Sequence, residues 1–352
     1  MRIAIEKRTK KSRLAIFLVP IVSFIISLLL GAIVLALSKA SPIAAYSAMV
    51  KGAFGNARWF QYTIVEALPL LLCGLGVGIA FRLKFWNIGA EGQYIWGAIG
   101  ITWVMQFWKF LPVWMLLPVG LVVGLITGAL WAGVPGYLKA QWGVDETLTT
   151  LMLNYVAIGY AEYLYIDHWK APFGNFGTPE FPELARLPRV WGRVHAGVFI
   201  ALALVVILWF FLYKTRWGFE MNMIGKNPRA ARYQGVSIKK NIVVAMLASG
   251  AICGLAGAVN TAAVTFRLTK GVDAGYGFTG IVIAWMAGLN PFASIVVAIV
   301  MAALKTGADQ LQIAVKLPEA MGPVLQGLVL IPLLAGSIFT DYHLKLHRKE
   351  AR

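Results

Sequence analysis

Residues 62–93 read YTIVEALPLLLCGLGVGIAFRLKFWNIGAEGQ, and the character of the chain changes abruptly within them. The first part, 62–81, is apolar and long enough to cross a bilayer as one helix. The second part, 82–93, carries charge and two glycines where it meets the next apolar run. Glycine permits backbone conformations that larger residues obstruct, so we expect helix geometry to be broken here, at or near membrane depth.

The whole chain shares this apolar character. Of its 352 residues, 59% are hydrophobic and 13% are charged, whereas a soluble domain averages about 45–50% and 25%. At about 20 residues a span this suffices for about ten transmembrane helices. We therefore predict an all-α, polytopic membrane protein forming one membrane domain over 1–352. Its apolar segments lie near 14–38, 62–81, 88–108, 112–137, 148–166, 196–213, 241–263, 276–288, 291–312 and 321–340.

The positive charge, +17 net, predicts the orientation. Basic residues gather in the N-terminus (1–13), in the 214–240 loop and in the tail (341–352), and short basic loops beside spans mark the cytoplasmic side. The 167–195 segment is nearly balanced in charge and is expected outside. We predict a multi-pass membrane protein with both termini cytoplasmic, and this placement of charge favours lipid over nucleic acid as its partner.

Termini on one side require an even number of crossings. Gly288-Leu289-Asn290-Pro291 divides a long apolar run at 276–312, and splitting it there gives ten segments instead of nine. The block formed by segments two to five then begins outside, and the block formed by segments seven to ten begins inside. Two such blocks of opposite orientation predict an inverted repeat. Paired interrupted helices of this kind indicate a translocation site near the bilayer midplane.

Polar residues in apolar surroundings are the candidates for that site. Asn87, Gly89, Glu91 and Gln93 lie in the broken stretch, and a carboxylate at such depth is costly unless it faces protein or water. The alternative for Glu91 is a surface ion pair with Arg82 or Lys84.

Two further amides, Asn154 and Asn260, lie inside apolar segments. Each is either a substrate contact or an interhelical hydrogen bond worth about 1 kcal/mol.

The basic loop contains a short predicted helix. Asn227 is placed to cap it, Pro228 to begin it and Gly235 to end it. Its polar surface excludes a span, so it is either a docking element or a solvated loop. The capping signals favour docking.

Other small and sulfur-bearing residues point to packing. Cys73 and Cys253 lie in apolar runs, where neither a disulfide framework nor a metal site is expected. Small residues recur at every fourth position in two segments, which predicts close helix contacts. These residues are Gly120, Gly124, Gly128, Ala132 and Gly136, and Gly250, Gly254, Ala258 and Ala262.

Several of these motifs together resemble the permeases of bacterial ABC importers of the ribose and nucleoside type. The residues Gly225, Asn227, Ala230, Ala231 and Gly235 are similar to the coupling-loop pattern of that family. The stretch 85–93 looks like the Phe-Asn-Ile-Gly-x-Glu-Gly-Gln motif of the nucleoside branch, with Trp86 inserted, and 146–155 and 67–70 are also similar. Because Phe85, Trp86 and Tyr155 lie within or beside these motifs, the resemblance implies that they are the aromatic residues nearest a nucleobase.

The resemblance implies a protein of the bacterial cytoplasmic (inner) membrane that works together with several other subunits. It implies a second permease, identical or a sister chain, a solute-binding lipoprotein outside and a cytoplasmic ATPase that grips the coupling loop. The chain has no phosphate loop of its own, so we expect no cofactor in it, with ATP and Mg²⁺ bound by the ATPase.

Three other functions remain as alternatives. A simple-sugar permease of the same fold differs only at the 87–93 motif. An ion-coupled secondary transporter would need mid-membrane carboxylates, for which Glu91 is the candidate. An intramembrane enzyme is disfavoured because no catalytic grouping of residues is visible. The sequence thus predicts a nucleoside permease with no catalytic residues.

Overall fold

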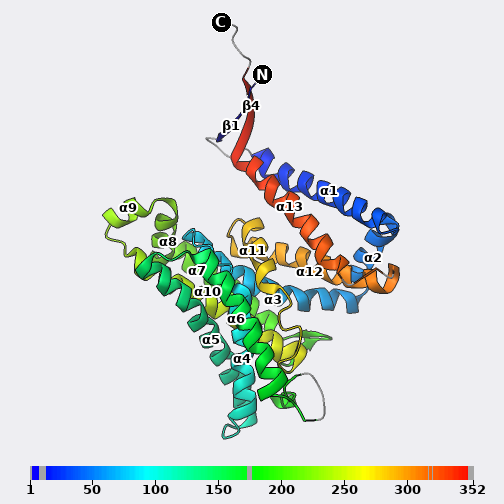
Figure 1. Ribbon diagram of the computed structural model, residues 1–352, viewed down its shortest axis with the longest axis vertical. Coiled ribbons are helices and arrows are strands. Elements are labelled where there is room, and N and C mark those ends of the chain that lie inside the picture. The colour runs from blue at the N-terminus through cyan, green and yellow to red at the C-terminus, as the bar shows by residue number, and fades with distance from the viewer. Residues whose placement is uncertain (1, 8–12, 173–176, 316, 319, 348–352) are drawn as a thin grey trace. The chain divides into compact units, whose positions relative to one another are not determined.

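Helices account for most of the chain in the computed structural model, which describes residues 2–7, 13–172, 177–315, 317–318 and 320–347 (Figure 1). Parts of the predicted basic N-terminus, external loop and basic tail lie outside these residues, at 8–12, 173–176 and 348–352. The chain divides into two compact units, one formed by 60–302 and the other by 1–59 with 303–352. The boundaries between them fall within helices α3 and α12.

The larger unit holds most of the predicted segments. Its helices are α3 (Ala57–Arg82), α4 (Ala90–Phe107), α5 (Val113–Trp142), α6 (Glu146–Tyr163), α7 (Gly197–Lys214), α8 (Arg216–Lys226), α9 (Pro228–Tyr233), α10 (Ile238–Asn260), α11 (Tyr276–Met286) and the start of α12 (Pro291–Val315). Single π-helical turns extend α6 over Leu164–His168 and α10 over Thr261–Thr265. The segment before α7 contains a short 3-10 turn, Glu183–Ala185, and a hairpin of β2 (Arg189–Trp191) and β3 (Val194–His195).

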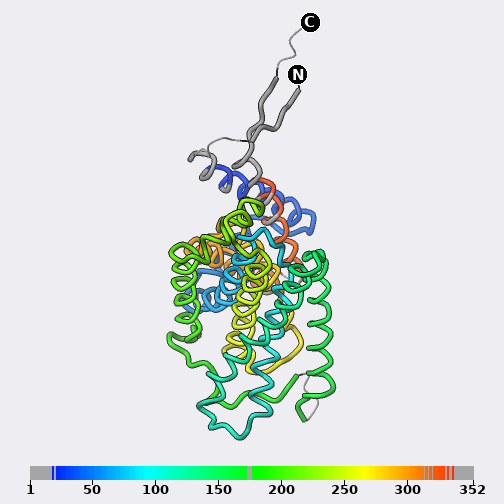
Figure 2. Tube along the Cα trace, turned by 90° about the vertical axis from the view of Figure 1, so that its left-hand side faces the viewer, coloured from blue at the N-terminus to red at the C-terminus, as the bar shows by residue number. Residues whose placement is uncertain are grey.

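The centre of this unit is the contact among α4, α5 and α10, which run side by side in Figure 1 and Figure 2. A methyl group added at Gly128 would overlap the backbone of Gly250 and Gly254, and one at Gly124 would overlap Ala258. The two predicted series of small residues therefore pack against each other, which confirms their structural role.

The smaller unit is assembled from both ends of the chain. It contains α1 (Arg13–Leu37), α2 (Pro42–Phe54), the end of α12 and α13 (Met321–Asp341). Apolar side chains from these helices form one core: Leu35, Ala45, Met49, Leu311 and Leu325. The hydroxyl group of Ser27 donates to the carbonyl oxygen of Val329 at 3.1 Å, which joins α1 to α13.

The two terminal strands of this unit pair with each other. β1 (Arg2–Lys7) runs antiparallel to β4 (Tyr342–His347), with Arg2 opposite His347. The pairing places the two strands side by side, and both the even number of crossings and the side of the membrane on which the ends lie stay predictions.

Each of the ten predicted segments contains a helix, but the count of ten crossings is not established. Among the described residues, five helices are long and apolar enough to span a membrane: Ala57–Arg82, Val113–Trp142, Gly197–Lys214, Ile238–Thr265 and Pro291–Gln312. A sixth would be the pair Ile21–Leu37 and Pro42–Phe54, bent by 116°. Helix α2 is absent from the predicted segments because its 13 residues are too few for a span.

Candidate substrate path and coupling loop

Both predicted interruptions are real breaks in the helices. Helix α3 ends at Arg82, and α4 begins only at Ala90. Helix α11 ends at Met286 and α12 begins at Pro291, with Gly288 and Leu289 between them in the left-handed region (φ 59° and 60°).

Arg82 connects the two breaks. Its guanidinium Nη2 donates to the carbonyl oxygen of Leu289 at 2.8 Å, and the group also lies over the ring of Tyr213 at 4.7 Å. The arginine is therefore engaged at the end of α3. It is not the ion-pair partner of Glu91 that the sequence offered as an alternative.

A buried amide network organises the first break. The side-chain oxygen of Asn87 accepts from the backbone N–H of Gly89 and from the amide of Gln93, each at 3.0 Å, and its amide nitrogen donates to Ser249 Oγ at 3.0 Å. Asn87 is 0% exposed and Gln93 is 1% exposed. The network therefore joins the break to α10 through bonds that the side chains make with one another.

Asn154 of α6 holds the same break from the other side. Its Oδ1 accepts from Gly92 N and its Nδ2 donates to the carbonyl oxygen of Ile88, both at 2.8 Å. The N–H of Ile88 donates to the hydroxyl oxygen of Thr150 at 3.2 Å. Two residues of α6 thus satisfy backbone groups that a broken helix leaves without partners. This is the interhelical bond that the sequence analysis set beside a substrate contact.

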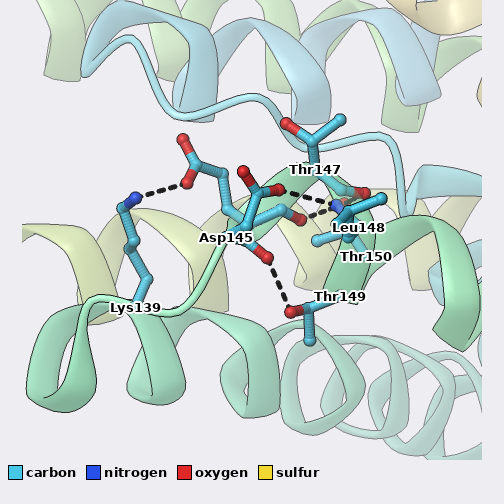
Figure 3. Close-up of polar contacts among 7 residues, drawn as sticks. Lys139, Asp145, Thr147, Leu148, Thr149 and Thr150 are labelled. Atoms are coloured by element: carbon cyan, nitrogen blue, oxygen red, sulfur yellow. Dashed lines mark hydrogen bonds and ion pairs between the residues drawn. The ribbon is translucent and has the colours of Figure 1, made fainter.

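The start of α6 is fixed by its own capping contacts (Figure 3). The carboxylate of Asp145 accepts from Leu148 N at 2.9 Å, and its carbonyl oxygen accepts from the Thr149 hydroxyl at 2.7 Å. Lys139 pairs with Glu146 at 2.6 Å. Because the cap sets where the helix begins, it also sets where Thr150 and Asn154 meet the break.

Glu91 lies one residue inside α4 and is 1% exposed. Its Oε1 accepts from the backbone N–H of Gly275 at 2.9 Å, and its Oε2 accepts from that of Gly277 at 2.6 Å. Gly275 directly precedes α11, and Gly277 lies in its first turn. The carboxylate therefore joins the starts of two interrupted helices, and it bonds to these backbone groups instead of forming the ion pair with Arg82 or Lys84 that was the alternative.

A second polar group lies beside this contact. Asn260 Nδ2 donates to the hydroxyl oxygen of Tyr94 at 2.7 Å, and the ring of Tyr94 packs against that of Tyr276 at 5.4 Å between centroids. The Tyr276 hydroxyl donates to Glu66 at 2.9 Å. Asn260 thus bonds to Tyr94, the residue that follows Gln93 of the amide network, rather than to the network itself.

The three aromatic residues that were predicted to lie nearest a nucleobase differ in their exposure. Phe85 is buried, Trp86 is 46% exposed and Tyr155 is 63% exposed on α6. Trp86 stacks on Trp285 of α11, with centroids 5.7 Å apart and planes 28° apart. No motif pointed to Trp285, since one tryptophan near a helix end is unremarkable.

The coupling loop has the predicted form. Asn227 Oδ1 accepts from the N–H groups of Arg229 and Ala230 at 3.0 and 3.2 Å, Pro228 begins α9 and Gly235 follows it with φ +76°. Ala231 is fully buried, whereas Tyr233 is 93% exposed. The short helix therefore presents a basic and aromatic surface and is anchored through one alanine.

Helix α8 lies within the predicted basic loop and attaches this surface to the rest of the unit. Asn222 accepts from Arg82 Nη1 at 3.4 Å, and Glu220 accepts from the Asn241 amide of α10 at 3.1 Å. Met221 and Ile224 are buried on the same face. Helices α8 and α9 thus contact the end of α3 and the start of α10.

Comparison with known proteins gives the family. Residues 59–334 match the model of the branched-chain amino acid transport system permease component. The chain is 33% identical to the guanosine ABC transporter permease protein NupP of Bacillus subtilis, over 91% of this chain and 93% of that protein.

Two further relatives differ in their solutes. The glucose ABC transporter permease protein TsgB13 of Haloferax volcanii is 33% identical over 92% of this chain and 88% of its own length. The nucleoside ABC transporter permease protein NupB of Lactococcus lactis is 28% identical over 83% of each chain. This chain belongs to the permease family that residues 59–334 match, and it is a multi-pass, all-helical membrane protein.

Proposed function

We propose that this member of the branched-chain amino acid transport system permease family is the membrane subunit of an ATP-binding-cassette importer and carries a nucleoside into the cell. A separate cytoplasmic ATPase binds ATP and Mg²⁺ and drives alternating access. A second permease, either a copy or a sister chain, completes the path, and an extracytoplasmic lipoprotein delivers the solute. Both termini of this chain lie in the cytoplasm.

The observation that carries this proposal is the construction of α9. Its ends are capped, one alanine anchors it, and its exposed residues include two arginines and a tyrosine: Arg229, Arg232 and Tyr233. Aromatic and arginine side chains are enriched where one protein binds another. A partner that pulls on α9 would act on α3 and α10 through α8. The free energy of ATP hydrolysis then acts on the permease as a difference in the partner's affinity for its two conformations.

The nucleoside is favoured over other solutes by two features. The names of NupP and NupB refer to nucleosides. In this chain, Trp86 and Trp285 offer half-exposed rings on which a planar base could stack. A simple sugar is the second candidate, because similarity to TsgB13 is equally high.

Reconstitution of the complete importer in proteoliposomes tests the proposal. With ATP inside and the lipoprotein outside, we expect uptake of guanosine or uridine and little uptake of glucose. Glucose uptake without nucleoside uptake would replace the substrate by the second candidate. Uphill uptake by this chain without any ATPase would overturn the importer mechanism in favour of ion-coupled transport.

A further inference from the structure

The carboxylate of Glu91 occupies the N-terminus of α11. That helix has 11 residues, and its first backbone N–H groups have no partner within the helix. Two N–H groups there, those of Gly275 and Gly277, bond to the two oxygens of Glu91, which comes from α4 and is 184 to 186 residues away in sequence. The contact is buried, with Glu91 1% exposed.

The N-terminus of an interrupted helix is a place where a transporter can bind a negatively charged solute. The aligned peptide dipoles give this end a partial positive charge, and its N–H groups bind carboxylate or phosphate. In transporters with broken helices, such ends point at the anionic group of the substrate near the midplane. In this chain a residue of the protein already fills that position.

The close packing of the two helices leaves no room for a second anion beside Glu91. A methyl group added at Gly277 would overlap the backbone of Glu91 and Ala90. The two helix starts are therefore in direct backbone contact. An anionic solute could reach the N–H groups only by displacing the carboxylate.

Apart from Arg82 at the start of the break and the exposed Lys84 within it, the other polar side chains around the break are neutral. They are the amides of Asn87, Gln93, Asn154 and Asn260 and the hydroxyls of Thr150 and Ser249. Among the buried side chains that the structure describes, the one arginine, Arg82, is bound to Leu289 and Asn222 at the end of α3. A phosphate or carboxylate entering here would meet the charge of Glu91 with no further buried cation among the described residues to offset it, at a cost of several kcal/mol in a medium of low dielectric.

We propose that Glu91 is the residue that restricts this transporter to uncharged solutes, by filling the anion site at the start of α11 with its own carboxylate. This inference rests on the proposed transport function. It goes further by excluding nucleotides and amino acids, whose transport would require the site that Glu91 occupies.

Chemical rescue tests the role of Glu91. In the complete importer, Glu91→Ala should lower nucleoside uptake at least tenfold, because the N–H groups of Gly275 and Gly277 lose their acceptors. Sodium acetate supplies a small carboxylate that fits the space of the removed side chain, and it should restore a measurable part of uptake. Sodium chloride at the same concentration should restore much less.

A matched variant and a second readout keep the test independent of folding. Glu66→Ala removes a carboxylate that accepts from the Tyr276 hydroxyl instead of from a helix start, so acetate should not restore its uptake. In thermal melting of the purified chain in detergent, acetate should raise the Tm of Glu91→Ala and leave wild-type protein unchanged. Absence of acetate rescue in both uptake and melting would overturn the anion-site assignment.

A panel of solutes separates this inference from the proposed function. Wild-type importer should take up its solute only in uncharged form, with a nucleoside 5′-monophosphate and a branched-chain amino acid rejected. Uptake of a neutral solute that is not a nucleoside would refute the proposed substrate and support the role of Glu91. Uptake of the monophosphate or the amino acid would refute the role of Glu91.

Discussion

Gly225 of α8 packs directly on the backbone carbonyl oxygen of Arg82, the last residue of α3. A side chain at position 225 would overlap that oxygen. The coupling loop thus rests on the end of the helix that precedes the first break, and the guanidinium of the same Arg82 reaches the second break at Leu289. Arg82 thus contacts α8 and lies at both interruptions.

Replacing Gly225 by alanine should uncouple the importer. The added methyl group must push α8 away from α3, since the atom that it meets belongs to backbone. We expect uptake to fall at least fivefold while the chain still reaches the membrane, as measured by transport in vesicles and by immunoblotting. Gly159→Ala is the matched control, because a methyl group there meets nothing within 4 Å, and its uptake should be normal.

The exposed tip of α9 should determine binding of the ATPase. Tyr233→Ala removes a 93% exposed ring and should weaken copurification of the ATPase about tenfold, which corresponds to roughly 1.4 kcal/mol. Leu184→Ala, also strongly exposed at 80% but in the predicted external segment, should have no effect. A loss of copurification with Leu184→Ala and not with Tyr233→Ala would reverse the predicted topology.

The amide network should contribute to stability whether or not it contacts solute. Asn87→Leu leaves the partners Gly89 N, Gln93 and Ser249 without their bonds inside the protein. Each buried polar group left without a partner costs about 1–3 kcal/mol. We expect a clear drop in Tm, measured by thermal melting in detergent, compared with Ser38→Ala, which removes an exposed hydroxyl bonded only to its own helix.

His195, in the hairpin before α7, should make stability depend on pH. Its Nδ1 accepts from Gly197 N at 3.2 Å, and burial lowers its pKa from 6.5 to about 4. The unfolded chain therefore binds a proton that the folded chain does not as the pH falls from about 6.5 to 4. Stability is greatest above pH 6.5 and should decrease by up to about 3 kcal/mol by pH 4.

Melting temperatures of wild type and His195→Asn between pH 7.5 and 4 measure this effect. Asparagine retains an acceptor for Gly197 N but does not titrate in this range. The decrease in Tm toward acid pH should therefore be smaller in the variant. Equal slopes would mean that other groups determine the acid sensitivity.

Much of the fold follows from local signals in the sequence. The breaks at 82–93 and 288–291 were predictable because charge, glycine and proline interrupt long apolar runs, and α9 because its cap and end residues are explicit. Helix α8 was not predicted. Its polar residues surround Met221 and Ile224, and these two can be recognised as a buried face only when α3 and α10 are known to pack against the helix.

The partners of the candidate residues were much harder to predict. Asn87, Glu91 and Asn154 could be chosen because a polar group in an apolar segment needs a partner. Their partners were hidden, because Ser249 and Thr150 are common residues in membrane helices and the donors to Glu91 are backbone groups. The loop at Gly275 carries no residue type that announces a contact 184 positions away.

The pairing of the two chain ends has a consequence for biosynthesis. Helices α1 and α2 are made long before their core partners Leu311 and Leu325, which lie far along the chain from them. Translation at about 5–20 residues per second leaves them waiting roughly ten to fifty seconds. During that interval the ribosome-bound chain exposes an unmatched apolar surface in the bilayer, and assembly factors that shield nascent membrane segments would find their substrate there.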